Sequence, residues 1–453
     1  MFSMVSCIAA LLAFFPAPFI VQGTARPSNL EYDRRELVIP MRDGVRLTAI
    51  ALVPTGVPRP LPIILIRTPF GAAREFRTAE LPLALRELGE DGYIFVTQDI
   101  RGRSGSDGTF VTLRPMADPR DSRGTDESTD AWDTIDWLVK NLPRNNGRVG
   151  VLGVSYRGWL AGMAGVRPHP ALKAISPQAP VADAWLGDDF FHQGAFRQTQ
   201  GVLYSAYIEG TKGLSIPDYD QYQFYLRLGT LSSIGKATGV DTLPSWRGFR
   251  AHPTYDAYWQ ARAMQRILTT PAVPTLIVGG WWDEEDILGP QVAYRTLERR
   301  DVSNWNRLVM GPWSHGAWAR GSGDSLGPVS LGSSTADHFR GQIQRPWFAH
   351  YLHGKGDGAF PEVWAFETGT NRWRTFDSWP PRNATPRKLY LREHGALSFS
   401  PPKATANSFD AFRSDPAHPV PHTPRPDDGS TSGNWLQQDQ RFVDGRPDVL
   451  TWI

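Results

Sequence analysis

The feature that constrains this chain most is the stretch Arg148-Val-Gly-Val-Leu-Gly-Val-Ser155-Tyr-Arg-Gly158. An apolar, β-branched run enters a tight turn at Ser155, and Trp159-Leu-Ala-Gly-Met continues with a helical pattern. Such a strand–turn–helix unit exposes a serine hydroxyl at the end of a sheet, and it requires minimal side chains at Gly153 and Gly158. The second glycine comes one position later than in the general Gly-x-Ser-x-Gly pattern. We predict a nucleophilic serine; the alternative is a buried strand followed by an ordinary glycine-rich turn.

Short apolar runs recur on both sides of this stretch. They fall at 61–66, 93–97, 149–154, 174–179, 275–279 and 307–311. Segment 130–141 lies between two of them and has apolar residues at helical spacing. Strands that alternate with helices predict an α/β fold with a mainly parallel sheet and helices on both faces. In such sheets the active groups lie just beyond the carboxyl ends of the strands.

Two segments depart from this alternation. Between 181 and 270 the strand pattern stops, and the chain is rich in Tyr, Phe, Gln and Gly with helical stretches. From about residue 356, short strands alternate with Pro, Gly, Asn and Asp, which is typical of an all-β domain. We therefore predict a signal segment followed by a core that is interrupted by a helical cap and followed by a β domain. The predicted bounds are 1–25 for the signal, 26–180 and 271–355 for the core, 181–270 for the cap and 356–453 for the β domain.

The N-terminal 25 residues contain an apolar run that ends with the small residues Gly23 and Ala25. This pattern predicts a secretory signal peptide, although no Lys or Arg precedes the run; an uncleaved N-terminal anchor is the alternative. Cys7 is the only cysteine and would leave with the signal, so we expect no disulfide and no thiolate metal site. We expect a secreted or periplasmic protein without a stable membrane span once the signal is removed. The net charge of +2, without a clustered basic helix, argues against nucleic acid as a partner.

A nucleophilic serine needs a base, and the base needs a carboxylate that orients it. In α/β-hydrolases these partners follow in the order Ser, Asp, His, each on a loop after a core strand. Asp283 follows the predicted strand 275–280 and His315 follows the strand 307–310, so both lie at the same sheet edge as Ser155. The rival histidines have weaker contexts: His169, His192, His252, His350 and His353. We predict Ser155, His315 and Asp283 as a catalytic triad.

Several stretches resemble one group of serine hydrolases. They are Arg67-Thr-Pro-Phe70, Asp99-Ile-Arg-Gly-Arg-Ser-Gly-Ser-Asp-Gly, Gly187-Asp-Asp189, Trp282-Asp-Glu-Glu-Asp286 and Gly311-Pro-Trp-Ser-His315. With the serine turn, they are similar to the X-Pro dipeptidyl-peptidase/cocaine-esterase group, and within it most to the α-amino acid ester hydrolases, also called β-lactam antibiotic acylases. The resemblance implies an α/β-hydrolase core, an inserted helical cap and a C-terminal jelly-roll β domain.

The resemblance also implies a carboxylate cluster that binds the α-ammonium group of the substrate, and this cluster falls on Asp189, Glu285 and Asp286. Acids gathered in a covered site repel one another and favour a cation that relieves the repulsion. The alternatives are a solvated acidic turn for Glu285 and Asp286 and a helix N-cap for Asp189. No metal or cofactor is implied.

The sequence departs from the family pattern at three places. Phe70 stands where the family has a tyrosine whose hydroxyl donates to the oxyanion, so the backbone N–H of Tyr156 remains as the expected donor. Arg157 occupies an elbow position that is often acidic. The chain stops at Ile453, where a strand pattern begins, so we expect the jelly roll to lack strands and to expose edges. The alternatives are a truncated gene product and a chain that is completed by self-association as a homo-oligomer.

We therefore expect a serine hydrolase that cleaves small α-amino acid esters, and also β-lactam amides, through an acyl-enzyme. The alternatives are a broad carboxylesterase or acylase without an amino requirement, and a catalytically impaired homologue, which Phe70 and the short β domain would explain. An aminopeptidase is a less favoured interpretation, although the same acids would hold a peptide N-terminus.

Overall fold

The computed structural model describes residues 30–453, apart from 119, 122, 188, 211–213, 215, 217–218, 403–408 and 430–434. The predicted signal segment at 1–25 lies outside the described residues. In the part of the chain that is described, no helix is long and apolar enough to cross a membrane.

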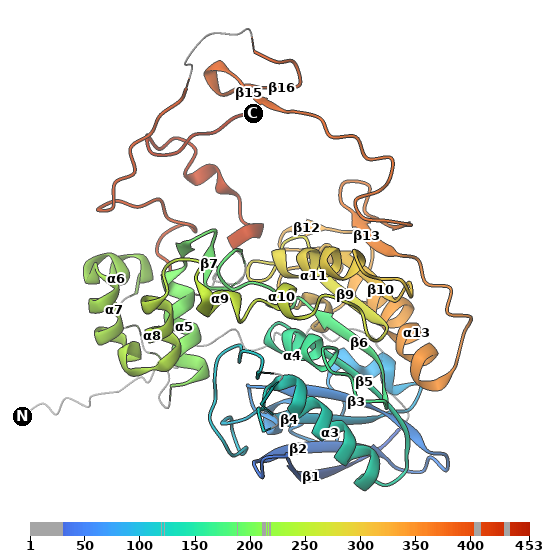
Figure 1. The fold of residues 1–453 in the computed structure, drawn as a ribbon. Coiled ribbons are helices and arrows are strands. Elements are labelled where there is room, and N and C mark those ends of the chain that lie inside the picture. Colours follow the sequence, from blue (N-terminus) through green and yellow to red (C-terminus); the bar gives the residue numbers. More distant parts are fainter. Residues whose placement is uncertain are drawn as a thin grey trace, which may run out of the picture.

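A ten-stranded sheet forms the centre of the molecule (Figure 1). In spatial order its strands are β1 (Tyr32–Pro40), β2 (Arg46–Pro54), β4 (Ile94–Asp99), β3 (Leu61–Thr68), β5 (Asn145–Val154), β6 (Leu172–Gln178), β9 (Thr275–Gly280), β10 (Asn306–Gly311), β13 (Val363–Glu367) and β14 (Arg372–Phe376). From β4 to β13 all neighbours are parallel, and β1, β2 and β14 are antiparallel to theirs. The carboxyl ends of the parallel strands therefore meet at one edge, as the sequence predicts.

Helices cover both faces of this sheet, and consecutive side chains of a strand pack against helices on opposite faces. Ile63 of β3 lies in a buried cluster with Ile135 of helix α3 (Glu127–Asn141). The next residue, Ile64, lies in a second cluster with Trp347 of the helical segment 335–353. Because consecutive side chains of a strand point to opposite faces, a continuous apolar run such as β3 is buried on both sides.

The segment between β6 and β9 forms a helical cap. Its helices are α5 (Gln198–Ile208), α6 (Gln221–Leu228), α7 (Leu231–Thr238), α8 (Pro244–Ala251), α9 (Ala257–Gln260) and α10 (Met264–Ile267). Trp246 and Trp259 of the cap share one buried cluster with Tyr156 and Trp159 of helix α4 (Tyr156–Ala164). The cap is thereby packed against the helix that begins at the predicted nucleophile.

The region after residue 356 differs from the sequence prediction. Strands β13 and β14 were expected in a separate β domain, but they extend the central sheet, with Val363 of β13 beside Leu308 of β10. The prediction was wrong here because a short apolar strand pattern does not specify the sheet that the strand joins. Among the described residues after 376, the paired strands are the short β15 (Tyr390–Leu391) and β16 (Leu397–Ser398). These residues do not build the expected jelly roll.

The C-terminal segment instead arches over the molecule and returns to the cap (Figure 1). Arg425 pairs with Asp220 at 2.6 Å, at the start of α6. The backbone N–H of Gln221 donates to the carbonyl of Asp427 at 2.6 Å, and the hydroxyl of Tyr222 donates to the carbonyl of Pro419 at 2.7 Å. The segment is thus held by its contacts with the cap.

Candidate active site

The predicted elbow is a strained turn between β5 and α4. Ser155 has φ 66° and ψ −130°, a left-handed conformation that costs a non-glycine residue on the order of 1–3 kcal/mol. A side chain at Gly158 would place its Cβ 2.3 Å from the carbonyl oxygen of Gln178, and one at Gly153 would lie 2.5 Å from Cβ of Arg157. The backbone N–H of Ser155 donates to the same carbonyl of Gln178 at 2.9 Å. Both glycines are therefore required by close backbone approach.

His315 and Asp283 form a hydrogen-bonded pair at the same edge of the sheet. Asp283 follows β9, His315 follows β10, and Nδ1–H of His315 donates to the two carboxylate oxygens of Asp283 at 2.9 and 3.0 Å. Asp283 is fully buried and also accepts the backbone N–H groups of Glu285 and Asp286 at 3.0 and 2.8 Å. The carboxylate is fixed by these bonds, so it holds the ring through Nδ1 and leaves Nε2 as the atom that can exchange a proton.

Electrostatics favour a charged pair. Burial raises the pKa of Asp283, but the charge and hydrogen bond of His315, with the two backbone N–H groups, lower it below its usual value. Burial lowers the pKa of His315, yet the negative charges of Asp283, Glu285 and Glu284 outweigh this and raise it to about 10. The surroundings therefore stabilise the imidazolium that forms when the base takes a proton.

The loop that carries His315 packs against the end of β5. A Cβ at Gly316 would lie 3.2 Å from Cγ1 of Val154, the residue before Ser155. Among the described residues, Ser155 Oγ makes no hydrogen bond to His315, and Nε2 of His315 lies 3.5 Å from a carboxylate oxygen of Glu285. Catalytic hydrogen bonds of this kind often tighten only when substrate is bound.

The three acids predicted to bind an ammonium group, Asp189, Glu285 and Asp286, gather around His315, and we call them the acidic cluster. Asp286 is fully buried, with an oxygen 3.8 Å from Nδ1 of His315. Burial and the charge of Glu285 raise the pKa of Asp189 to about 7, while the charge of His315 opposes this shift. The cap positions Asp189 through Gln200, whose side-chain N–H donates to the carboxylate at 3.4 Å.

Glu284 is a member of this site that the sequence analysis missed. Its side chain is buried, and one carboxylate oxygen accepts the backbone N–H of His315 at 3.1 Å. Burial raises its pKa to about 7, helped by the charges of Glu285 and Asp283 and opposed by that of His315. The signal was present, since Asp283 to Asp286 is an unbroken run of acids after a buried strand.

The donor atoms of Glu285, Asp286 and His315 lie within 4.8 Å of one another, which also suits a small cation. A metal ion and an organic ammonium would relieve the same repulsion between these carboxylates. Nε2 of His315 cannot ligate a metal and accept the serine proton at the same time. The donor set therefore fits a metal only at the expense of the base.

The two residues expected to affect the oxyanion site are Tyr156 and Phe70. Tyr156 is held by a hydrogen bond, and Phe70 packs against Tyr207 and Arg157. The ring of Tyr156 is buried, and its hydroxyl oxygen accepts the backbone N–H of Leu113 at 2.8 Å. The ring of Phe70 lies 5.7 Å from that of Tyr207, and Cζ of Arg157 lies 5.8 Å from the Phe70 ring centre. Two of the three departures noted in the sequence, Phe70 and Arg157, are thus in contact with each other.

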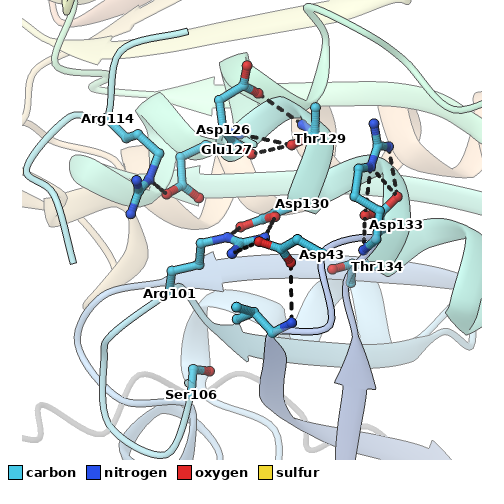
Figure 2. A network of polar contacts seen from close by, with 12 residues as sticks. Asp43, Arg101, Ser106, Arg114, Asp126, Glu127, Thr129, Asp130, Asp133 and Thr134 are labelled. Atoms are coloured by element: carbon cyan, nitrogen blue, oxygen red, sulfur yellow. Dashed lines mark hydrogen bonds and ion pairs between the residues drawn. The ribbon is translucent and has the colours of Figure 1, made fainter. Parts of the chain in front are cut away.

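Two of the family motifs, at residues 67–70 and 99–108, supply arginines to a network of ion pairs. Arg101 pairs with Asp130 and Asp43, both at 2.6 Å, and Arg114 lies 3.6 Å from Glu127 (Figure 2). Arg67, three residues before Phe70, pairs with Glu127 at 3.0 Å. We call these six residues the arginine network. It joins the end of β3, the turn between β1 and β2 and the loop after β4 to the start of α3.

A doubly wound parallel sheet with a strained serine after β5, and a histidine and an aspartate after later strands, defines the α/β-hydrolase fold of serine hydrolases. The family model of the X-Pro dipeptidyl-peptidases (S15 family) matches residues 43–317, more than half of the chain. The chain belongs to this family and is a serine ester hydrolase.

Relatives agree with this assignment. A cocaine esterase from Rhodococcus sp. (strain MB1 Bresler) is 29% identical over 446 residues, which cover 92% of this chain and 73% of that enzyme. The solved structure of an α-amino acid ester hydrolase is 40% identical with a TM-score of 0.88 and covers 98% of this chain and 75% of its own. An aminopeptidase from the marine sediment archaeon Thaumarchaeota archaeon is also 40% identical, with a TM-score of 0.88, covering 96% of this chain and 74% of that one. The family resemblance and the α/β-hydrolase core predicted from the sequence are confirmed.

Proposed function

We propose that this protein hydrolyses α-amino acid esters through an acyl-enzyme formed on Ser155. The observation that carries the proposal is the hydrogen-bonded pair of His315 and Asp283, which lies at the sheet edge beside the strained serine. A base oriented in this way is the partner that an activated serine needs.

In the proposed reaction, Nε2 of His315 removes the proton of Ser155 as Oγ attacks the acyl carbon. The proton then passes to the leaving alcohol as the C–O bond breaks. Water attacks the acyl-enzyme with His315 again acting as the base, which releases the amino acid and restores the serine. Asp283 stays ionised and stabilises the imidazolium. The same steps apply to amide-linked β-lactams, with an amine as the leaving group.

The backbone N–H of Tyr156 is the proposed oxyanion donor, at the start of α4. Phe70 has no hydroxyl to add a second donor, and one missing donor typically costs about 10²–10³-fold in turnover. A strong rise in turnover for Phe70→Tyr would favour the second candidate, an impaired homologue. Unchanged turnover would show that the present oxyanion site is complete.

The acidic cluster is proposed to hold the α-ammonium group of the substrate. Asp189, Glu285 and Asp286 lie around a single imidazole, and the raised pKa of Asp189 reflects burial and repulsion from Glu285. A bound ammonium group would relieve that repulsion without using Nε2 of His315. It would also place the adjacent acyl carbon near Ser155.

The test compares an α-amino acid ester with its des-amino analogue, which has the same carbon skeleton and leaving group. We expect the amino ester to be hydrolysed with the higher kcat/KM, and equal values would favour a broad carboxylesterase. Labelling by a fluorophosphonate that is lost in Ser155→Ala checks the nucleophile independently. Absence of labelling in the wild type would contradict the whole mechanism.

From the N-terminal apolar segment at 1–25, we infer that the protein acts outside the cytoplasm, as a secreted or periplasmic enzyme. Its proposed partner is a small ester or amide substrate. Retention of residues 1–25 in the purified mature protein, read by N-terminal sequencing, would contradict cleavage of a signal.

A further inference from the structure

A cavity beside the elbow takes no part in the mechanism above. It has a volume of about 70 Å³. The residues that matter for its shape are Leu152, Val154, Arg157, Phe76, Ala84 and Ala319. They come from the end of β5, the first turn of α4, the chain between β3 and β4, and the loop that follows His315.

The lining of this cavity includes close sequence neighbours of the nucleophile. Among the lining residues Leu152 and Phe76 are buried, whereas Val154, Arg157 and Ala319 are half-buried, and we call these three the rim. Val154 precedes Ser155, Arg157 follows it by two residues, and Ala319 follows His315 by four. The rim residues are thus one to four positions in sequence from the predicted nucleophile and base.

The cavity and the acidic cluster lie on different sides of Ser155. Leu152 and Phe76 belong to the buried cluster on the sheet face that segment 335–353 covers. Phe190, the neighbour of Asp189, belongs to the buried cluster that includes the cap. The cavity is therefore separate from the site proposed for the ammonium group, and a different part of the substrate would occupy it.

The chemistry of the lining favours a hydrocarbon group. The polar side chains deep in the cavity are already bonded, since Gln178 donates to Gln344 at 2.8 Å and accepts from Nε1 of Trp318 at 2.7 Å. At the rim, Arg157 pairs with Glu75 at 2.5 Å, and Nε of Arg157 is the lining donor that remains buried without a partner. A polar ligand would find few open partners inside, so apolar contact supplies the binding.

The volume limits the size of this group. A dry apolar cavity of roughly 150 Å³ accommodates benzene, so one of about half that volume has room for roughly three carbon atoms. We propose that the elbow cavity binds the alkyl part of an ester's leaving group and that, among the alkyl esters of α-amino acids, this enzyme prefers those of short unbranched alcohols. This inference rests on the proposed ester hydrolysis at Ser155.

The test measures kcat/KM of the full chain for the methyl, ethyl, propyl, hexyl and benzyl esters of alanine. Each buried methylene is expected to raise kcat/KM roughly fourfold from methyl to propyl, with no further gain for hexyl or benzyl. A flat series, or a continued rise to hexyl and benzyl, would overturn the assignment.

Ala84→Leu fills the cavity, and Ala73→Leu is the matched control at an exposed position of helix α1 (Ala72–Glu75) that does not line it. We expect the ratio of propyl to methyl kcat/KM to fall close to one in Ala84→Leu and to stay at the wild-type value in Ala73→Leu. This ratio does not depend on the folded fraction, because both esters are measured on one preparation.

A second series separates the leaving group from the acyl group. It uses methyl esters of glycine, alanine and longer straight-chain α-amino acids, and Ala84→Leu should leave its dependence on chain length unchanged. If Ala84→Leu alters the acyl series and not the alcohol series, the cavity binds the acyl group and the inference is wrong. If no ester is hydrolysed and no fluorophosphonate labels Ser155, the proposed function itself fails.

Discussion

Two groups of charged side chains near the site differ in the balance between positive and negative charges. The arginine network has three guanidinium groups and three carboxylates, and Arg101 is bonded on both sides by Asp43 and Asp130 (Figure 2). Around His315, the loop 283–286 and Asp189 place five carboxylates about one imidazole. Arg197 lies close by, but it donates to the backbone carbonyl of Asp189 at 3.1 Å.

The pKa values reflect this difference. The hydrogen bond from Arg101 lowers the pKa of Asp43, whereas burial and the charge of Glu285 raise the pKa of Asp189 to about 7. Burial also raises the pKa of Glu127 within the network, against the charge of Arg67. A balanced set of buried charges stabilises the fold, while an unbalanced set in a covered site is suited to receive a cation.

The largest effect is expected at Asp283, the carboxylate that is hydrogen-bonded to the proposed base His315. Asp283→Asn keeps the shape of the side chain but removes the charge that orients and stabilises the imidazolium of His315. We expect kcat/KM for an α-amino acid ester to fall about 10⁴-fold. Circular dichroism checks that the variant is folded, and a loss below tenfold would contradict the role of Asp283.

Breaking the balanced network should instead affect stability. Arg101→Met removes the cation that Asp43 and Asp130 share, and it leaves the fully buried Asp130 with Arg67 alone, at 3.8 Å. We expect the free energy of unfolding to fall by about 3–5 kcal/mol, measured by urea denaturation, with kcat per folded molecule retained. Arg46→Met is the control, because its pair with Asp107 is exposed and should change stability by less than about 1 kcal/mol. Equal losses in the two variants would contradict the distinction.

Asp189→Asn tests the cation directly. The amide still accepts the hydrogen bond from Gln200, but one charge is lost from the acidic cluster. We expect kcat/KM for the α-amino ester to fall about 10- to 100-fold, while that for the des-amino ester stays constant. A parallel fall for both esters would mean that Asp189 acts on the fold or on His315 instead.

The same variant has a pH signature in stability. The folded-state pKa of Asp189, about 7, is above its ordinary value near 3.8, so the folded protein holds this proton more tightly than the unfolded chain. Ionised Asp189 therefore costs stability progressively between about pH 4 and 7. Asp189→Asn should raise Tm more at pH 8 than at pH 5, in thermal scans at both values.

The smallest effect is expected at Glu284. Glu284→Gln retains an oxygen that accepts the backbone N–H of His315 but removes a charge that stabilises the imidazolium. The pKa of His315 should fall, so the acidic limb of the kcat/KM–pH profile should move down by about one pH unit. If the limb does not move, the charge of Glu284 has no effect on His315, and its role is limited to accepting the backbone N–H of His315. Glu284→Ala, which also removes this hydrogen bond, would then measure the structural effect.

Local patterns predicted much of this molecule. The strand runs, the tight turn at Ser155 and the positions of Asp283 and His315 after strands could be read in order, because strand ends in a parallel sheet share one edge. Strands β13 and β14 could not be assigned, because pairing with β10 depends on contacts distant in sequence. Glu284 was overlooked for a similar reason, since its partner His315 lies 31 residues further along the chain.

The sequence by itself therefore determined the class of fold, the placement of Ser155, Asp283 and His315 after successive core strands, and the excess of acids after β9. Each is encoded in hydrophobic periodicity or in residues that are close neighbours along the chain. Only the tertiary structure decided that Asp189 of the cap lies near those acids, that Arg157 contacts the ring of Phe70, and that a small cavity is lined by Gly153, Val154 and Arg157 of the elbow. These features depend on the packing of distant segments, and packing is the property that a linear pattern does not specify.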